Sequence, residues 1–216
     1  MANFIEEVDE EVRRDRAERL WKRWSPVIIG IVILLLAGVA GHQVWKGWQA
    51  DKAAAAGARF SAALGLAQAG KPAEAATAFA DLARADAGGY AALARFQQAA
   101  NLVEAKDAAG AIAVYDAIAG DAGTNPRFRD LARYLAVFHG LDQLTAEQTR
   151  QRLSAIGTDS PWSANARELA AVAELKAGNT EAARRQLTAL ADDPLLPTGL
   201  RGRATELLAA LGGPVQ

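Results

Sequence analysis

Five arginines recur after residue 58 at intervals of 34 to 38 residues, and they are the residues best placed to do chemistry. They are Arg59, Arg95, Arg133, Arg167 and Arg203. A guanidinium group has five N–H donors in a planar fork, which suits it to binding carboxylates. If stacked elements align the five groups, they form an arginine ladder that grips acidic or backbone groups of an extended protein. The alternative is that each arginine covers a seam between elements and pairs locally.

The rest of the residue inventory indicates no catalysis. The chain has no cysteine, which excludes disulfides, thiolate nucleophiles and cysteine-based zinc sites. Its two histidines, His42 and His139, are too few for a multi-histidine metal site. No phosphate-binding glycine loop or nucleophile elbow is present. We therefore expect no catalytic, cofactor-binding or metal-binding residues, no enzyme activity and no small-molecule substrate.

The overall charge gives no reason to expect a nucleic-acid partner. The 216 residues include 24 Lys and Arg against 25 Asp and Glu. Because affinity for nucleic acid depends on an excess of basic groups, a balanced chain is not expected to bind it.

After Ala50 the sequence is typical of short helices. Apolar residues recur every three or four positions, and glycine or proline interrupts the pattern at regular points. Asn125 and Ser160, each followed by proline, are predicted N-caps, and Thr145 with Gln148 fits a capping box. His139 is interpreted as an end residue whose charge suits a helix dipole. The predicted helices cover residues 50–69, 72–86, 89–105, 108–119, 126–141, 146–156, 161–177, 180–191 and 198–211.

These helices repeat in pairs. A large apolar residue recurs in every second helix, a small residue usually precedes it by four positions, and another usually lies sixteen positions before it. The large residues are Phe79, Tyr115, Leu153 and Leu187; the two other sets are Ala75, Ala111, Thr149 and Ala183, and Ala63, Ala99, Val137 and Ala171. This period resembles tetratricopeptide repeats, although Trp and Gly are missing from their usual places. The predicted fold is an all-α solenoid of about four helix pairs plus a capping helix.

Residues 24–45 form an uncharged, mostly apolar run of 22 residues. As a helix it is about 33 Å long, enough to cross a hydrocarbon core of about 30 Å. Trp21 and Trp24 precede the apolar core and Trp45 and Trp48 follow it, as expected of anchors at the two membrane interfaces. A cleaved signal peptide is the alternative, but the acid-rich region before the run favours a retained transmembrane helix.

The basic residues predict the orientation of this helix. Six Lys and Arg lie just before it, whereas only Lys46 and Lys52 follow closely, so we expect a cytoplasmic N-terminus. The tail is either a recognition peptide or a topology signal with a solvated helix, with pairs such as Asp9–Arg13 and Asp15–Arg19. The predicted domains are a cytoplasmic tail (1–23), a transmembrane helix (24–45), a periplasmic repeat domain (46–211) and a flexible end (212–216).

The whole arrangement resembles the ancillary subunit of the bacterial Sec translocon. The similarity includes the charged tail, the single span with its Trp-rich end, and an Ala-rich helical stretch from Tyr90 to Tyr115. The resemblance implies a single-pass protein of the bacterial inner membrane, with its repeat domain near the translocon exit. It implies no catalytic residues.

From this we expect a membrane-anchored interaction module that links exported polypeptides to periplasmic chaperones. Its expected partners are translocon subunits, periplasmic chaperones or exported polypeptides, together with the lipid bilayer. The alternative is a structural scaffold in another cell-envelope machine, such as cell division or outer-membrane assembly.

Overall fold

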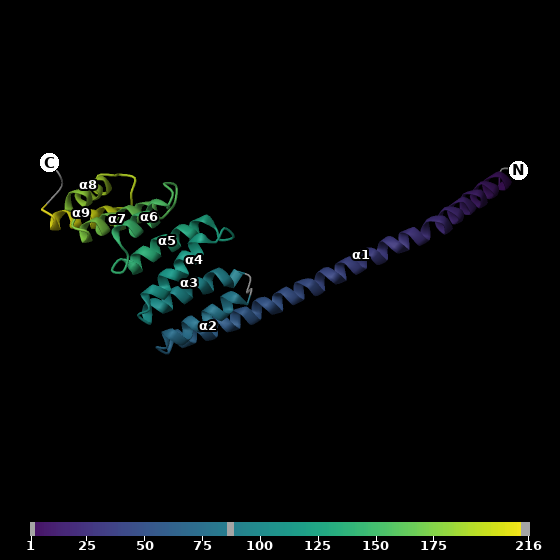
Figure 1. Ribbon diagram of the computed structural model, residues 1–216. Helices are drawn as coiled ribbons and strands as arrows, with labels where there is room; N and C mark the ends of the chain where they lie inside the picture. Colours follow the sequence, from purple (N-terminus) through teal and green to yellow (C-terminus); the bar gives the residue numbers. More distant parts are fainter. Residues whose placement is uncertain (1–2, 86–88, 213–216) are drawn as a thin grey trace. The chain divides into compact units, whose positions relative to one another are not determined.

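The computed structural model describes residues 3–85 and 89–212, although the side chains of residues 3–20, 22, 23, 25, 27–29 and 32 are not described. In these ranges the backbone is helical with no strand, and nine helices follow one another along the chain (Figure 1). They are α1 (Asn3–Gln68), α2 (Pro72–Arg84), α3 (Gly89–Glu104), α4 (Ala108–Gly120), α5 (Pro126–Gly140), α6 (Ala146–Ser154), α7 (Ser163–Lys176), α8 (Thr180–Ala191) and α9 (Thr198–Ala210). The predicted all-α class is confirmed for this part of the chain.

The chain divides into two compact units, which we call the N-terminal unit (1–54) and the repeat unit (55–216). In the N-terminal unit the described apolar side chains of α1 face outward. Trp21, Trp24, Trp45 and Trp48 are 51 to 65% exposed. The Trp45 and Trp48 rings lie 5.5 Å apart, and Lys52 Nζ lies 3.6 Å from the Trp48 ring centre.

Within the described residues, no helix has a stretch long and apolar enough to cross a membrane. The predicted span at 24–45 includes Ser25, Val27, Ile28, Ile29 and Val32, whose side chains lie outside the described set. The predicted pairs Asp9–Arg13 and Asp15–Arg19 lie outside it too.

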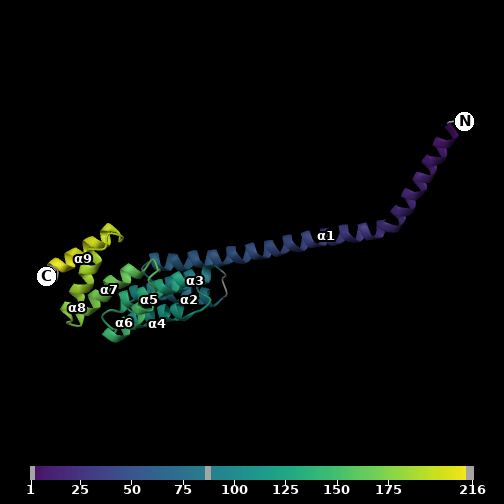
Figure 2. The ribbon, with the colours of Figure 1, turned by 90° about the horizontal axis from the view of Figure 1, so that it is seen from above.

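In the repeat unit the helices pack in pairs, each against its neighbours in sequence (Figures 1 and 2). We number the pairs as repeats 1 to 4, after which α9 packs on α8 and α7. The end of α1 with α2 makes repeat 1, α3 with α4 repeat 2, α5 with α6 repeat 3, and α7 with α8 repeat 4. This arrangement agrees with the predicted solenoid of four helix pairs and a capping helix.

The predicted periodic residues form the interior of the repeat unit. Phe79, Tyr115, Leu153 and Leu187 are at most 6% exposed, and the small residues that precede them are buried as well. The small residues let paired helices approach, while each large side chain contributes about 1.5–3 kcal/mol by leaving water. Burial is spread over four clusters along the unit rather than gathered in one centre. Each repeat is therefore stabilised mainly by its neighbours.

Most predicted helix ends are confirmed to within two residues, but the predicted start at residue 50 is wrong, since α1 continues through it from Asn3 to Gln68. The Asn125 side chain accepts a hydrogen bond from Arg127 N at 3.0 Å, and the Thr145–Gln148 capping box is complete. The prediction for Ser160 is wrong, since α7 begins at Ser163 with Trp162 as its N-cap. Ser160 Oγ instead accepts a weak bond from Trp162 N at 3.4 Å within a turn. Trp162 is half-buried and packs against a cluster of buried residues shared by repeats 3 and 4, and the helix starts only after it.

The turn inside three of the repeats has the same left-handed geometry at the same position. Gly70 and Lys106 lie 36 residues apart, Gly178 follows Lys106 by 72 residues, and the three φ values are 73°, 64° and 80°. In each turn this residue's N–H and the next bond back to carbonyls of the preceding helix at 2.8 to 3.0 Å. Glycine adopts this conformation without strain, whereas Lys106 carries a Cβ there.

Candidate protein-interaction surface

Four of the five ladder arginines have an acidic partner inside the repeat unit. Arg95 bonds to Asp121 at 2.7 Å, and Arg133 bonds to Asp130 at 2.7 Å. Arg203 forms a bidentate pair with Glu168, with both bonds at 2.7 Å, which joins α9 to α7. The contact of Arg167 with Asp193 is looser, at 3.9 Å.

The Arg95 pair shows how such a bond organises a repeat. Asp121 is the C-cap of α4, so its bond to Arg95 of α3 fastens the two helices at one end. The same carboxylate accepts bonds from Gly123 N and Thr124 Oγ1. These hydrogen bonds, that from Arg95 first among them, hold the pKa of Asp121 below its ordinary value.

The geometry therefore favours local pairing for Arg95, Arg133 and Arg203. Arg133 also donates to the carbonyl of Ala119 at 3.4 Å, which joins repeat 3 to repeat 2. Among the described side chains, Arg59 and Arg167 are the two ladder arginines without a close ion pair. Partner binding by the whole ladder stays a prediction.

The register of the repeats explains what the arginines replace. In the tetratricopeptide signature, a Trp stands four positions before the conserved Gly and a Leu one position before it. Ala99 takes the Gly position of repeat 2, which puts Arg95 at the Trp position and Gln98 at the Leu position. In repeat 4 the same two positions hold Arg167 and Ala170. Two large apolar side chains are thus exchanged for a flexible cation and a smaller residue.

Grooves open beside these exchanged positions. The Arg95 groove lies among α2, α3 and α4, has a volume of about 660 Å³ and includes Gln98, Val114 and Ala117. The Arg167 groove lies among α6, α7 and α8, has a volume of about 510 Å³ and includes Ala170, Gln186 and Ala189. These lining residues match one another at a spacing of 72 positions. A related groove of about 350 Å³ contains Arg59 of repeat 1.

Aromatic side chains join successive repeats, a contact that the sequence alone did not reveal. The aromatic residue after each of the first three ladder arginines contacts a ring at the start of the next repeat. The pairs are Phe60–Tyr90 at 5.6 Å, Phe96–Phe128 at 6.2 Å and Tyr134–Trp162 at 6.0 Å between ring centres. The arginine-aromatic dipeptides were a signal for the first member of each pair. The second member has no fixed spacing, so only the fold reveals it.

Two titratable rings also stack at the junction of repeats 2 and 3. His139 lies in the last turn of α5, as predicted, and stacks on Tyr115 of α4 at 6.0 Å. Burial lowers the pKa of His139 and raises the pKa of Tyr115 to about 12. His139 is thus a packing residue at the helix end, and its burial disfavours the charged form of the imidazole.

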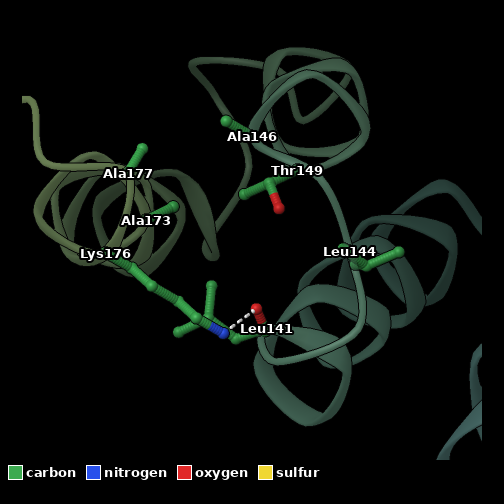
Figure 3. A pocket seen from close by; sticks show the side chains of 7 residues that line it. All are labelled: Leu141, Leu144, Ala146, Thr149, Ala173, Lys176 and Ala177. Carbon is green, nitrogen blue, oxygen red and sulfur yellow. Dashed lines mark hydrogen bonds between the residues drawn. The ribbon is translucent and has the colours of Figure 1, made fainter.

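A small hollow lies at the junction of repeats 3 and 4. Figure 3 shows Thr149 and Ala173 beside it, and Lys176 reaching across to donate to the carbonyl of Leu141 at 2.7 Å. Its volume is about 170 Å³, and its lining is mostly apolar. Lys176 also pairs with Asp142 at 2.5 Å. The contacts of Lys176 with Leu141 and Asp142 close one side of the hollow between repeats 3 and 4.

The described residues contain no group of three or more His, Asp or Glu side chains arranged to hold a metal ion. Among the residues whose burial is described, the buried polar side chains are Asn101 and Thr149, and Asn101 donates to the carbonyl of Gln97 within its own helix. The surface of the repeat unit therefore offers grooves and arginines for contacts with other molecules.

Comparison with known families matches residues 18–185 to the tetratricopeptide repeat-like domain. No curated protein and no solved structure matches the chain significantly. Solenoids of this kind present extended surfaces to other proteins and are usually non-catalytic. Since the match covers more than half of the chain, this protein belongs to the tetratricopeptide repeat-like domain family and carries a protein-interaction module.

Proposed function

We propose that this chain is a membrane-anchored interaction module accessory to the bacterial Sec translocon. One observation carries the proposal: a tetratricopeptide-like domain is joined to an uncharged run bracketed by four exposed tryptophans. The module works on the periplasmic side of the inner membrane, where it links exported polypeptides to chaperones.

Exposed apolar side chains of the N-terminal unit support the anchor. Leu34, Val39 and Val44 are 69 to 73% exposed. Apolar surface in water costs about 25 cal/mol per Å², and a lipid bilayer removes this cost. Tryptophan at both ends suits the two interfaces, where its ring lies in apolar surroundings and its N–H meets polar groups.

Anchoring explains how a surface without an enclosed binding site can function. A module fixed beside the translocon exit meets emerging polypeptides at a high effective concentration, so weak contacts are sufficient. Translocon subunits, periplasmic chaperones and exported polypeptides are the proposed partners. The same architecture fits a scaffold in cell division or outer-membrane assembly.

The absence of cysteine permits a direct test of topology. A single cysteine at Ala122, exposed in the loop after α4, should react with a membrane-impermeant maleimide once the outer membrane is opened. A single cysteine at Ala17 should react only after the inner membrane is dissolved. The reverse pattern, or equal labelling of both variants, would contradict the proposed orientation.

Crosslinking tests the choice of partner. Photoreactive residues placed singly between positions 46 and 60 should recover translocon subunits and nascent exported chains from intact membranes. The matched control places the same group on Ala209 of α9, an exposed position in the last helix. Recovery of only division or outer-membrane components would replace the translocon proposal by the scaffold.

A further inference from the structure

Among the three grooves, the Arg167 groove combines an apolar floor with arginines that are only partly paired with acidic groups. Leu153 and Ile156 form part of its floor and are 6% and 8% exposed, and Ala166 and Ala170 lie beside them. Arg150, Arg167 and Arg185 line it, and no carboxylate does so among the described residues. The Arg95 groove has the same position in its repeat but only two arginines.

The arginines of the two grooves differ in how well they are paired. In the Arg95 groove, Arg84 bonds to Asp81 at 2.5 Å and Arg95 bonds to Asp121 at 2.7 Å. In the Arg167 groove, Arg150 bonds to Glu147 at 2.5 Å, whereas Arg167 has a carboxylate oxygen only at 3.9 Å. Arg185 is exposed, and among the described side chains no acidic group forms a salt bridge with it. Two of the three guanidinium groups are therefore available to a partner.

The three arginines come from α6, α7 and α8, whose axes are about 8–10 Å apart if they pack normally. A ligand with one small anionic group cannot reach all three. A protein segment with several carboxylates can, and its apolar side chains would cover Leu153 and Ile156. Carboxylate–guanidinium bonds are strongest when they are bidentate and partly shielded from water, as beside this floor.

We propose that the Arg167 groove binds an acidic, apolar segment of a partner protein, with Arg167 and Arg185 contacting its carboxylates. This proposal rests on the proposed role of the repeat unit in binding other proteins. It does not depend on whether the chain works with the Sec translocon. Of the five ladder arginines, only Arg167 lines this groove. Arg150 and Arg185, which do not belong to the ladder, line it as well. The exchange of Trp and Leu for Arg167 and Ala170 makes the space for the segment.

A direct binding experiment uses the full chain in detergent and a fluorescein-labelled peptide, Leu-Glu-Leu-Leu-Glu-Ala-Leu-Glu. The control peptide has Lys in place of each Glu. The acidic peptide should bind at least tenfold more tightly, and its affinity should fall as salt is raised. Equal affinity for the two peptides overturns the proposal.

Matched variants locate the binding site. Arg185→Glu should weaken the acidic peptide at least tenfold, whereas Arg84→Glu in the Arg95 groove should change its affinity less than twofold. Ala189→Trp blocks the groove and should abolish binding, whereas Ala117→Trp, the equivalent change in the Arg95 groove, should not. These residues are exposed, so unchanged helical circular dichroism should accompany every variant.

Other results overturn the proposal in distinct ways. Equal losses in the two grooves would mean nonspecific attraction to basic surface. Binding of dodecanoate, with no binding of the peptide, would assign the groove to a small amphiphile. Because purified chain is used, failure here leaves the topology and crosslinking results unaffected, and their failure leaves this one unaffected.

Discussion

Repeats 2 and 3 keep the same register but fill their interiors differently. Repeat 2 places Tyr115 at the large position, in contact with Phe96 and stacked against His139. Repeat 3 places Leu153 there and has Thr149 where the other repeats have alanine. Its second helix, α6, has nine residues, against thirteen in α4.

The difference shows what the repeat signature controls. A repeat forms whenever large and small residues keep their spacing, but how completely a junction is filled depends on the size of the side chains. Beyond repeat 3 the filling is incomplete and a hollow remains beside Thr149. We expect the junction of repeats 3 and 4 to be the first part of the repeat unit to open.

Truncating the large residues should give the largest effects. Tyr115→Ala should lower the free energy of unfolding by about 3–5 kcal/mol, and Leu153→Ala by about 2–3 kcal/mol, because Tyr115 loses more buried surface. Urea unfolding of the full chain in detergent, followed by circular dichroism, measures both. A larger loss of unfolding free energy for Leu153→Ala than for Tyr115→Ala would contradict this prediction.

Alkaline pH should weaken repeat 2 through Tyr115. Its pKa of about 12 lies above the ordinary value, so the unfolded chain releases this proton first and stability is lost as pH rises from 10 to 12. The loss attributable to Tyr115 should reach about 2 kcal/mol at pH 12. Tyr115→Phe should remove it, so the stability difference between wild type and variant should change with pH. A difference that stays constant from pH 8 to 12 would exclude this role.

Gly140 tests the close approach of the two repeats. A Cβ on Gly140 would lie 2.6 Å from Ile112 Cδ1, whereas one on Gly120 would meet nothing within 4 Å. Both glycines end a helix, so Gly120→Ala measures the gain in helix propensity alone. Gly140→Ala should be less stable than Gly120→Ala by about 1–2 kcal/mol. Equal melting temperatures would show that Ile112 moves aside without cost.

Filling the hollow should strengthen the junction of repeats 3 and 4. Ala173→Leu adds three carbons where Figure 3 shows open space, and should raise the free energy of unfolding by about 1 kcal/mol after some repacking. Ala209→Leu, on an exposed face of α9, is the matched control and should change it little. Hydrogen exchange of α6 amides should slow in Ala173→Leu alone.

Replacing the strained turn residue should give the smallest gain. Lys106→Gly removes the cost of a Cβ in the left-handed region and should stabilise repeat 2 by about 0.5–1 kcal/mol. Gly178→Ala, at the equivalent turn of repeat 4, should have the opposite sign. If both variants lose stability, the turn of repeat 2 depends on the lysine side chain in a further way.

Helix periods and buried positions were predictable because they depend on spacing alone. Ala75 and Phe79 report the same helix face whatever lies opposite, and both are fully buried. The start of α7 was not predictable, because Trp162 packs against Tyr134 and the helix that Ser160 and the following proline indicated starts only after it. Contacts between helices therefore determine where α7 begins.

The partners of the arginines were only partly accessible from sequence. An aspartate lies 26 positions after Arg95 and after Arg167, but only Arg95 makes a close pair, at 2.7 Å, whereas Arg167 lies 3.9 Å from its aspartate. The same spacing from Arg133 leads to Asp159, yet Arg133 bonds to Asp130 on its own helix. Arg133 pairs with Asp130 because that carboxylate lies one helical turn away. The spacing between repeats does not predict this choice. The grooves needed the fold, since their walls come from three separate helices.

The Arg95 and Arg167 grooves are 72 residues apart, which is the length of two repeats. Each groove is built from three consecutive helices, so neither depends on the far end of the chain. Duplication of two repeats would add a groove without altering the existing ones, and deletion would remove one in the same way. Once a groove exists, a single substitution such as Ala113→Arg, at the position of the Arg95 groove equivalent to Arg185, changes its charge. The number of binding grooves and their specificity can thus change separately during evolution.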